Sequence, residues 1–283
     1  MLKALYSLLL YTLSFYAATA QILPLERALS INDQEQLTPF YEAINSGFLG
    51  VQVDVFSEED ELVVSQNEGR SRKFKSLYLE PLFELVKAHD GWLFNENQSF
   101  LLIINIKNQP HKTLHLLQRE LMLYRPYLSF CEKQEMRLKG VTVVLTGSRP
   151  IVEVAQLDTR WLFLEGRLDD SEELLKPYLS PLVSISWHEH FRWQGIGRIP
   201  QSELSIMQEM VEKIRGKGLQ IKFAGTPDTP DMWGVLWEEG IDFIGSSKLP
   251  LLKNFMIDQI LPMPTFTKPL RSRGSTTKLS KGG

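Results

Sequence analysis

The sequence predicts an α/β fold, a single-domain TIM (β/α)8 barrel, from three observations. Apolar, β-rich runs alternate with amphipathic helical segments at a fairly regular interval, which is the pattern of parallel βα units. Eight such runs occur along the chain. The length of 283 residues suits one barrel, which commonly needs about 250 residues. An open doubly wound sheet is the rival architecture, but it normally has fewer strands, and no glycine fingerprint follows the first run.

The expected strands are short and apolar. They are residues 26–31, 50–56, 100–106, 140–146, 161–165, 182–186, 219–224 and 241–245. In the run 50–56, GVQVDVF, three valines alternate with Gln52 and Asp54, so these two polar side chains share one face of the strand. The carboxyl ends of all strands in a parallel barrel meet at one mouth, and we expect Gln52 and Asp54 to lie near it.

Segments with apolar residues every three or four positions lie between these strands and predict helices. They are residues 37–46, 76–88, 112–125, 149–157, 171–178, 203–215, 231–239 and 249–260. Glycines such as Gly47 and Gly240 follow several of these segments, as expected of left-handed helix ends. The apolar stripes are therefore expected to face the core.

The two ends of the chain differ from the barrel segment, residues 21–262. Residues 1–20 resemble a secretory signal peptide, because Lys3 precedes an apolar run that ends in a small-x-small site at Ala18 and Ala20. A membrane anchor is the alternative, but Ser, Thr and Tyr interrupt the run. Residues 263–283 hold five basic residues and no apolar face, which predicts a disordered basic tail.

Composition excludes two classes of protein. Cys131 is the only cysteine, so no internal disulfide can form, although export would permit one. The formal net charge is -3, and the barrel segment is more acidic than that because the tail is basic. A nucleic-acid binder would carry a basic stripe, which this chain lacks.

No stretch beyond the signal segment is apolar and long enough to span a membrane. We therefore expect a secreted or periplasmic protein.

Several stretches together resemble one family. They are LPLERALSINDQ at 23–34, then GVQVDVF, SLYLEPL, INIK and TGSRP, then EGRLDD at 165–170 and FAGTPDTPDMW at 223–233. Their order and spacing are similar to those of the phosphatidylinositol-phospholipase-C-like and glycerophosphodiester phosphodiesterase barrels. The branch named "altered inheritance of mitochondria" protein is the most similar. The likeness covers nearly all of residues 21–262, and it implies a TIM barrel with phosphoric diester hydrolase activity in lipid metabolism.

The resemblance implies chemistry that needs two kinds of group. A divalent ion held by carboxylates neutralises the phosphate, while histidines activate the nucleophile and protonate the leaving oxygen. Leu29 and Ile31 stand at two family histidine positions, and Gln66 stands at the third. None of these side chains can transfer a proton. Such groups contribute roughly 100-fold to 10,000-fold each, so the sequence predicts that the family reaction is lost.

The metal positions that the resemblance implies are changed in the same direction. Gln52 replaces a glutamate and Asn105 replaces the third carboxylate, while Asp54 and the neighbouring Lys107 are retained. With Glu165, these residues predict at most a weak Ca²⁺ or Mg²⁺ site, because hard cations prefer charged oxygen ligands. No cofactor is implied with certainty.

Polar groups at or near the predicted strand ends are candidate ligand-binding residues. They are Asn32, Asp33, Lys107, Arg149, Arg167, Lys222, Trp187 and His188. Arginine and lysine in such a mouth receive phosphate or another anion. In the alternative interpretation, Asp54, Glu165, Lys107 and Arg167 pair with one another inside the barrel, because buried charges need partners with or without a ligand. Both interpretations remain open from the sequence.

The segment WHEH, residues 187–190, follows the sixth strand. In an extended chain His188 and His190 would point to one side, where they could hold zinc or act as a replacement acid and base. A hydrogen-bonded loop is the alternative, because two ligands do not make a metal site. Trp187 and the aromatic residues near it predict either a platform for a sugar ring or ordinary core packing.

The sequence thus predicts a secreted pseudoenzyme of phosphodiesterase ancestry that binds a small anionic, phosphodiester-like or sugar-like ligand. The alternative is an active metal-dependent hydrolase with a rearranged site built from Asp54, Glu165 and the WHEH histidines. A third possibility is a protein whose surface binds a partner and carries no small ligand.

Overall fold

The computed structural model describes residues 22–66 and 70–261. The expected signal peptide 1–20 and basic tail 263–283 lie outside these residues. Among the described residues, no helix has the length and apolar character needed to cross a membrane.

Eight parallel strands form the main sheet, in the order β12-β11-β10-β8-β5-β2-β1-β13. Their bounds are β1 Leu25–Ser30, β2 Phe48–Glu58, β5 Phe100–Ile106, β8 Val141–Gly147, β10 Phe163–Gly166, β11 Leu182–Ser186, β12 Gln220–Ala224 and β13 Ile244–Ser246. Each matches one strand expected from the sequence, with ends shifted by a few residues. The two edge strands are β12 and β13. They approach each other where an isolated parallel bridge joins Lys222 to Phe243. The α/β class and the parallel arrangement are confirmed.

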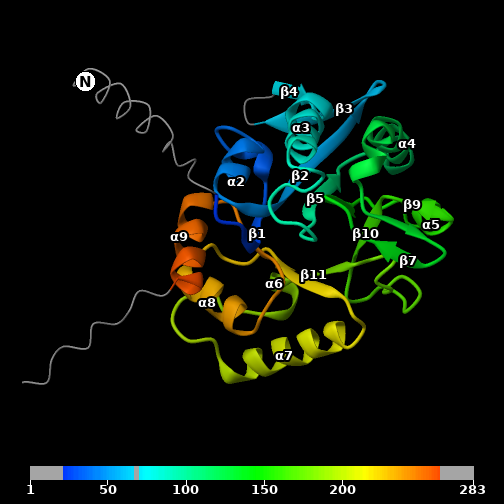
Figure 1. Cartoon of the computed structure of the whole chain (residues 1–283). Helices are drawn as coiled ribbons and strands as arrows, with labels where there is room; N and C mark the ends of the chain where they lie inside the picture. Colours follow the sequence, from blue (N-terminus) through cyan, green and yellow to red (C-terminus); the bar gives the residue numbers. More distant parts are fainter. Residues whose placement is uncertain (1–21, 67–69, 262–283) are drawn as a thin grey trace, which may run out of the picture.

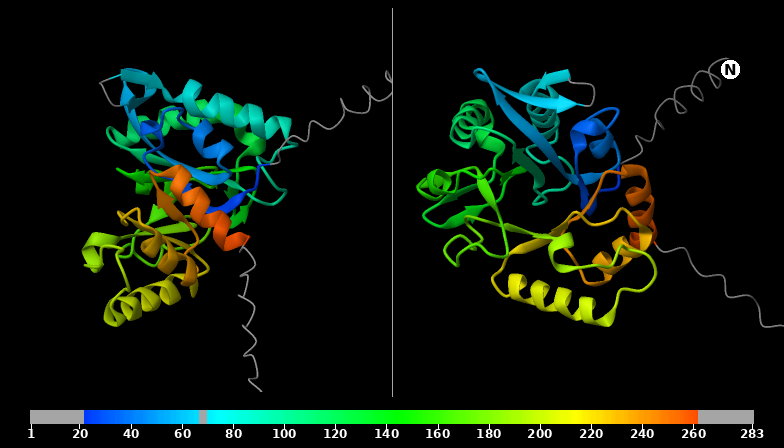
Figure 2. Two further views of the ribbon diagram at one scale, coloured as in Figure 1. Left: turned by 90° about the vertical axis from the view of Figure 1, so that its left-hand side faces the viewer. Right: turned by 180° about the vertical axis from the view of Figure 1, so that it is seen from behind.

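Two smaller strand groups lie outside the eight strands listed from the sequence. β2 runs on beyond the sheet and pairs antiparallel with β3 Glu61–Gln66, which pairs in turn with β4 Arg70–Lys73. This extension projects beyond the neighbouring helices (Figures 1 and 2). A separate small sheet consists of β7 Glu135–Arg137, β6 Phe130–Glu132 and β9 Thr159–Arg160. Cys131 lies in β6 and is buried with a free thiol.

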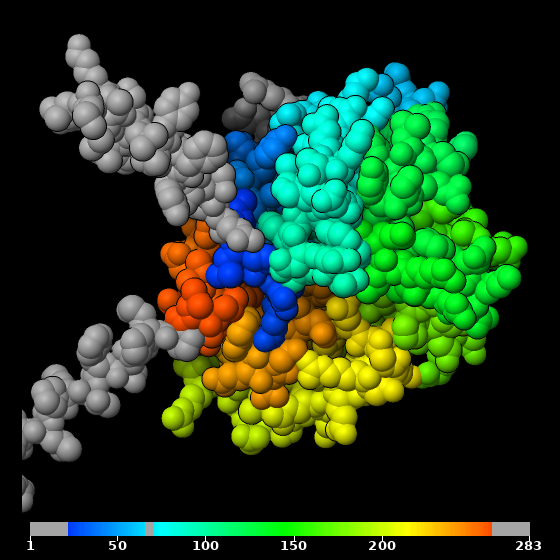
Figure 3. Space-filling view, viewed as in Figure 1, coloured from blue at the N-terminus to red at the C-terminus, as the bar shows by residue number. Residues whose placement is uncertain are grey.

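The helices lie around the strands (Figure 1). They are α2 Tyr41–Asn45, α3 Glu80–Ala88, α4 Pro110–Leu121, α5 Ile151–Ala155, α6 Trp187–His190, α7 Gln201–Arg215, α8 Pro230–Glu238 and α9 Leu249–Ile260, with the short turns η1 Asp33–Glu35, η2 Lys75–Leu79 and η3 Met122–Tyr127. α4 and α8 begin at a proline, which suits the first helical turn because the amide there has no partner within the helix. α9 packs beside the first described residues (Figure 3).

Two local predictions were wrong. Residues 171–178 form turns instead of a helix, with the amides of Leu174 and Leu175 both donating to the Ser171 carbonyl. Pro177 explains this, since it has no amide and disfavours helical backbone at the residue before it. The segment 187–190 is helical instead of extended. Trp187 and Phe191 stack at helical i, i+4 spacing, with ring centroids 4.3 Å apart.

Apolar side chains pack on both faces of the main sheet. Between the strands and the helices lie Val51, Val53 and Val55 together with helix residues such as Leu117. A second cluster occupies the other face, formed by Leu29, Leu101, Ile103, Cys131, Val144, Phe163, Leu182 and Phe243. Alternation along the strands places Gln52, Asn105, Glu165 and Lys222 on this second face, nearer the carboxyl ends. The apolar cluster therefore forms a floor beneath a polar layer.

Candidate functional site

The polar layer at the carboxyl ends of the strands contains the candidate site. Asp54 and Asn105 are in register on the paired strands β2 and β5. The Asn105 amide donates to Asp54 Oδ1 at 2.7 Å, and Lys107 Nζ lies 3.0 Å from Asp54 Oδ2. Both oxygens of the retained carboxylate are therefore engaged by groups of the chain itself. The backbone amide of Asp54 donates to Gln34 Oε1 at 3.2 Å, which ties β2 to the turn η1.

A second ionic group lies beside the first. Lys222 Nζ lies 3.1 Å from Gln52 Oε1 and 3.1 Å from Glu165 Oε1. The contact with Glu165 is an ion pair and not a well-aligned hydrogen bond, and the Thr146 hydroxyl donates to the other carboxylate oxygen. The Lys222 and Glu165 side chains are only 5% and 7% exposed. This pair is buried and charge-balanced.

Arg149 and Arg167 lie in different environments. The Arg149 guanidinium binds Asp170 in bidentate fashion, at 2.6 Å and 2.9 Å, and also donates to the Glu165 carbonyl. Burial raises the pKa of the Asp170 carboxyl, but hydrogen bonds from Arg149 and from the Arg167 amide outweigh this effect and hold the pKa below its ordinary value. Arg167 is exposed, and one of its guanidinium nitrogens donates to the Gly147 carbonyl at 2.9 Å. Arg167 is thus the arginine that a ligand can reach.

Asp33 anchors the loop after β1. It is fully buried and accepts hydrogen bonds from the Ser30 hydroxyl, the Phe40 amide and the Tyr78 hydroxyl, at 2.6, 2.6 and 2.9 Å. Burial raises the pKa of Asp33, although the three hydrogen bonds act in the opposite direction. Its neighbour Asn32 is exposed and left-handed, with φ 50°, a conformation that asparagine tolerates. Asp33 therefore holds the loop in place.

The three positions that the sequence resemblance assigns to histidines, Leu29, Ile31 and Gln66, carry no proton-transfer group. Leu29 is fully buried in the apolar floor, and Ile31 is half-buried against it. Gln66 ends β3 opposite Arg70 in the hairpin. The rest of that hairpin tip, residues 67–69, lies outside the described part of the chain.

The WHEH residues separate into core and surface. Trp187 is fully buried, and its indole N–H donates to the Trp193 carbonyl at 2.9 Å. Phe191 and Phe223 pack on its ring, so the aromatic group lies in the core. His188 and His190 are exposed. In a helical turn, side chains two residues apart point to different sides. The extended pair of histidines that the sequence suggested is therefore not formed.

A hollow of about 470 Å³ opens at the ends of β10, β11 and β12. It is lined by Glu165, Arg167, Leu168, Asp169, Ser184, Ile185, Ser186, Glu189, His190 and Ala224. The sequence pointed to Arg167, Glu165 and His190 but missed the two serines. Their alternation within the strand 182–186 was the available signal, because Ser184 and Ser186 fall on one face with their hydroxyls toward the mouth.

A divalent ion does not fit the oxygens at the candidate metal positions. The Asp54 oxygens face an amide N–H and an ammonium, and Gln52 and Glu165 face the Lys222 ammonium. Within residues 22–66 and 70–261, no group of three or more His, Cys, Asp and Glu side chains is arranged to hold a metal ion.

Two known proteins are similar to this chain over most of its length. The protein named "Altered inheritance of mitochondria protein 6 homolog" of Arthroderma benhamiae is 25% identical over 259 residues, which cover 80% of this chain and 82% of that protein. "Altered inheritance of mitochondria protein 6" of Eremothecium gossypii is 23% identical over 276 residues, covering 84% of this chain and 71% of that protein.

Two solved structures share the fold. A glycerophosphodiester phosphodiesterase from Parabacteroides distasonis superposes with a TM-score of 0.53 at 11% identity, covering 83% of this chain and 99% of its own. A phosphodiesterase from Oleispira antarctica, in complex with its product sn-glycerol-3-phosphate, gives a TM-score of 0.50 at 12% identity, covering 82% and 96%. Residues 17–165, more than half of the chain, match the AIM6-like phosphodiesterase domain. The resemblance seen in the sequence is thereby confirmed, and the chain belongs to the AIM6-like phosphodiesterase domain family.

Proposed function

We propose that the protein is a (β/α)8 barrel that has lost phosphodiester hydrolysis and binds a small anionic or sugar-like ligand at its mouth. One observation carries the proposal. Asp54 keeps its carboxylate, but Asn105 and Lys107 engage both of its oxygens, and no acid–base group accompanies it at Leu29 or Ile31. The bridge between Lys222 and Phe243 supports closure of the eight strands into a barrel. Export, predicted from residues 1–20, is part of the same proposal.

Loss of hydrolysis follows from what the reaction needs. Water attacks a phosphodiester efficiently only when a base removes its proton and an acid protonates the leaving oxygen. The buried aliphatic side chain of Leu29 does neither. A divalent ion would have to displace Lys107 and Lys222 from the carboxylates that they neutralise. Both parts of the family chemistry are therefore absent from this mouth.

The hollow beside this ionic layer supports ligand binding. Its serine hydroxyls and its carboxylates from Asp169 and Glu189 suit the hydroxyl groups of a sugar-like ligand. Arg167 supplies the accessible guanidinium for an anionic group, since Arg149 is already bound to Asp170. Trp187 lies in the core, so a stacking platform is not part of the proposal.

The alternative function is a metal-dependent phosphoric diester hydrolase with a rearranged site. The observation that favours it is that Glu165 and His190 line the same hollow, where they could act as acid and base. This alternative requires that a metal ion displace the lysines from the mouth. A partner-binding surface without a small ligand is the remaining candidate.

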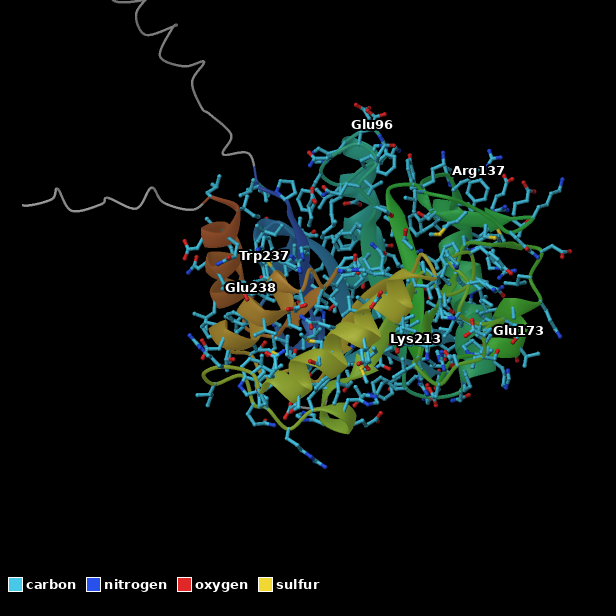
Figure 4. All side chains as sticks on the ribbon, turned by 90° about the horizontal axis from the view of Figure 1, so that it is seen from below. Glu96, Arg137, Glu173, Lys213, Trp237 and Glu238 are labelled. Carbon is cyan, nitrogen blue, oxygen red and sulfur yellow. The ribbon has the colours of Figure 1, made fainter. Side chains whose placement is uncertain are left out.

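Calorimetric titration of the full chain with sn-glycerol 3-phosphate and with myo-inositol tests the proposal. We expect at least one probe to bind, and Arg167→Met to weaken binding of the anionic probe by about tenfold or more. Arg137→Met is the matched control, because Arg137 is exposed on the distant small sheet (Figure 4). Metal-dependent turnover of a generic phosphodiester that Asp54→Asn abolishes would favour the enzyme. Binding unchanged in Lys107→Met/Arg167→Met would point to a partner-binding surface.

A further inference from the structure

We infer that the Lys222 ammonium is a fixed internal cation that neutralises the inner oxygens of the mouth and excludes a divalent metal ion from them. The inference deepens the proposed function, because it makes the ligand-binding mouth independent of metal. It concerns the polar layer, which shares Glu165 with the hollow, and it can be tested with metal ions alone.

Three strands supply the groups that surround this ammonium. Lys222 lies on β12, Gln52 on β2 and Glu165 on β10, and Nζ lies 3.1 Å from an oxygen of each of the other two residues. β12 and β2 are not neighbours in the sheet order. The Lys222 side chain therefore reaches across the inner face of the sheet. A cation held by oxygens from separate strands is the arrangement that a bound metal ion would need.

Burial holds the Lys222 side chain in place beside its oxygen partners. Lys222 and Glu165 are 5% and 7% exposed, and a buried ammonium is stable only when nearby oxygens balance its charge. Glu165 is held from its other side by the Thr146 hydroxyl, so the carboxylate cannot turn away easily. A divalent ion that approached these oxygens would meet a positive charge that has no exit to solvent. Like charges at such short range repel strongly where water is scarce.

Lys107 likewise neutralises Asp54, but its side chain is less constrained. Its side chain is 38% exposed, so it can move into solvent and release the carboxylate. Lys222 has no such freedom. Removing Lys222 is therefore the change that should open the inner oxygens, and restoring a glutamate at Gln52 should supply the missing charge.

The test is calorimetric titration of the full-length chain with Ca²⁺ and with Mn²⁺. We compare the wild type, Lys222→Met, Lys222→Met/Gln52→Glu and Lys213→Met. Lys213 is exposed on α7 (Figure 4), so its variant controls for loss of a lysine charge as such. We expect no binding at millimolar metal for the wild type and for Lys213→Met. The double variant should bind at least about tenfold more tightly than the wild type, because the charge of the oxygen group becomes more negative by two.

Thermal unfolding gives a second readout. Calcium should raise the melting temperature of the double variant above its value in chelator, while leaving that of the wild type unchanged. If Lys222→Met does not fold, Lys222→Gln/Gln52→Glu takes its place, because glutamine keeps a polar group at this buried position. Tight Ca²⁺ binding by the wild type, or no gain in a folded double variant, would overturn the inference. Failure of glycerol phosphate or inositol to bind would count against the proposed function alone.

Discussion

Lys222 and Glu165 form an ion pair in which both side chains are almost completely buried, with Nζ 3.1 Å from Oε1. A pair of this kind is costly to bury and more costly to break, because removing one partner leaves an uncompensated charge away from water. Asp54 and Lys107 form a second ion pair, which is more exposed to solvent. The two carboxylates at the candidate metal positions, Asp54 and Glu165, are thus each neutralised by a lysine of the chain.

Breaking the buried pair on one side should destabilise the fold. We expect Lys222→Met to lower the free energy of unfolding by roughly 3–5 kcal/mol, because Glu165 remains charged without its partner. The double variant Lys222→Met/Glu165→Leu should recover most of this loss. Urea unfolding of the four members of the cycle measures both effects. A cost below about 1 kcal/mol for the single variant, the size seen for exposed pairs, would contradict the burial argument.

The stability contributed by Asp170 should depend on acid pH. Its pKa in the folded protein lies below the ordinary value of 3.8, owing to Arg149 and the Arg167 amide. The contribution is therefore present above that ordinary value and is lost as the pH falls through the folded pKa. We expect Asp170→Asn to destabilise the protein near neutral pH, and the difference from the wild type to shrink toward about pH 2. Chemical unfolding across this range checks it, and a constant difference would count against it.

Asp33 should show the opposite dependence. Burial raises its folded pKa above the ordinary value of 3.8, so its contribution to stability is complete below that value and is lost as the pH rises through the folded pKa. Asp33→Asn removes this titration. The cost of the substitution should therefore be largest in acid and should shrink as the pH rises above the ordinary pKa value of 3.8. Unfolding curves for both proteins measure the difference in their free energies of unfolding. A difference that grows as the pH rises would contradict this prediction.

Gly147 tests how tightly the site is packed. Its φ is +74°, and a Cβ there would lie 2.2 Å from Asn105 Oδ1 and 2.6 Å from the Ile106 carbonyl oxygen. Gly197 is the matched control, because its φ is +68° but nothing lies within 4 Å of a Cβ. We expect Gly197→Ala to cost roughly 1–2 kcal/mol from backbone strain alone, and Gly147→Ala to cost more. Equal costs in thermal or urea unfolding would mean that Asn105 moves aside freely.

The sequence predicted the parallel strands well because hydrophobic alternation and helical spacing are local signals. The run 50–56 illustrates this, since its valines all face the helices in the structure. The helix predicted at residues 171–178 was wrong. Leu174 and Leu175 looked like part of an apolar helix face, but Pro177 disfavours helical backbone there. The helical turn at 187–190 was missed because it depends on stacking between Trp187 and Phe191, which only the folded core fixes.

The site was predictable in its residues but not in its pairings. The sequence named Gln52, Asp54, Asn105 and Glu165 as one group, and the structure brings them to one polar layer. The pairing of Asp54 with Lys107 was one of the alternatives seen in the sequence, but the pairing of Glu165 with Lys222 was not, and Lys222 lies 170 residues from Gln52 along the chain. Such contacts depend on strand order and register, which no short pattern reports. The serines of the hollow are different, because the alternation of Ser184 and Ser186 along β11 was a local signal that the sequence did offer.

The most direct test of the central claim is the rate at which the full chain hydrolyses bis(p-nitrophenyl) phosphate in Mg²⁺, Ca²⁺ or Mn²⁺. We predict a rate equal to that of metal and buffer alone, identical for the wild type and Asp54→Asn, because Leu29, Ile31 and Gln66 cannot transfer a proton and Lys107 neutralises the Asp54 carboxylate. Metal-dependent turnover by the wild type that disappears in Asp54→Asn would contradict it.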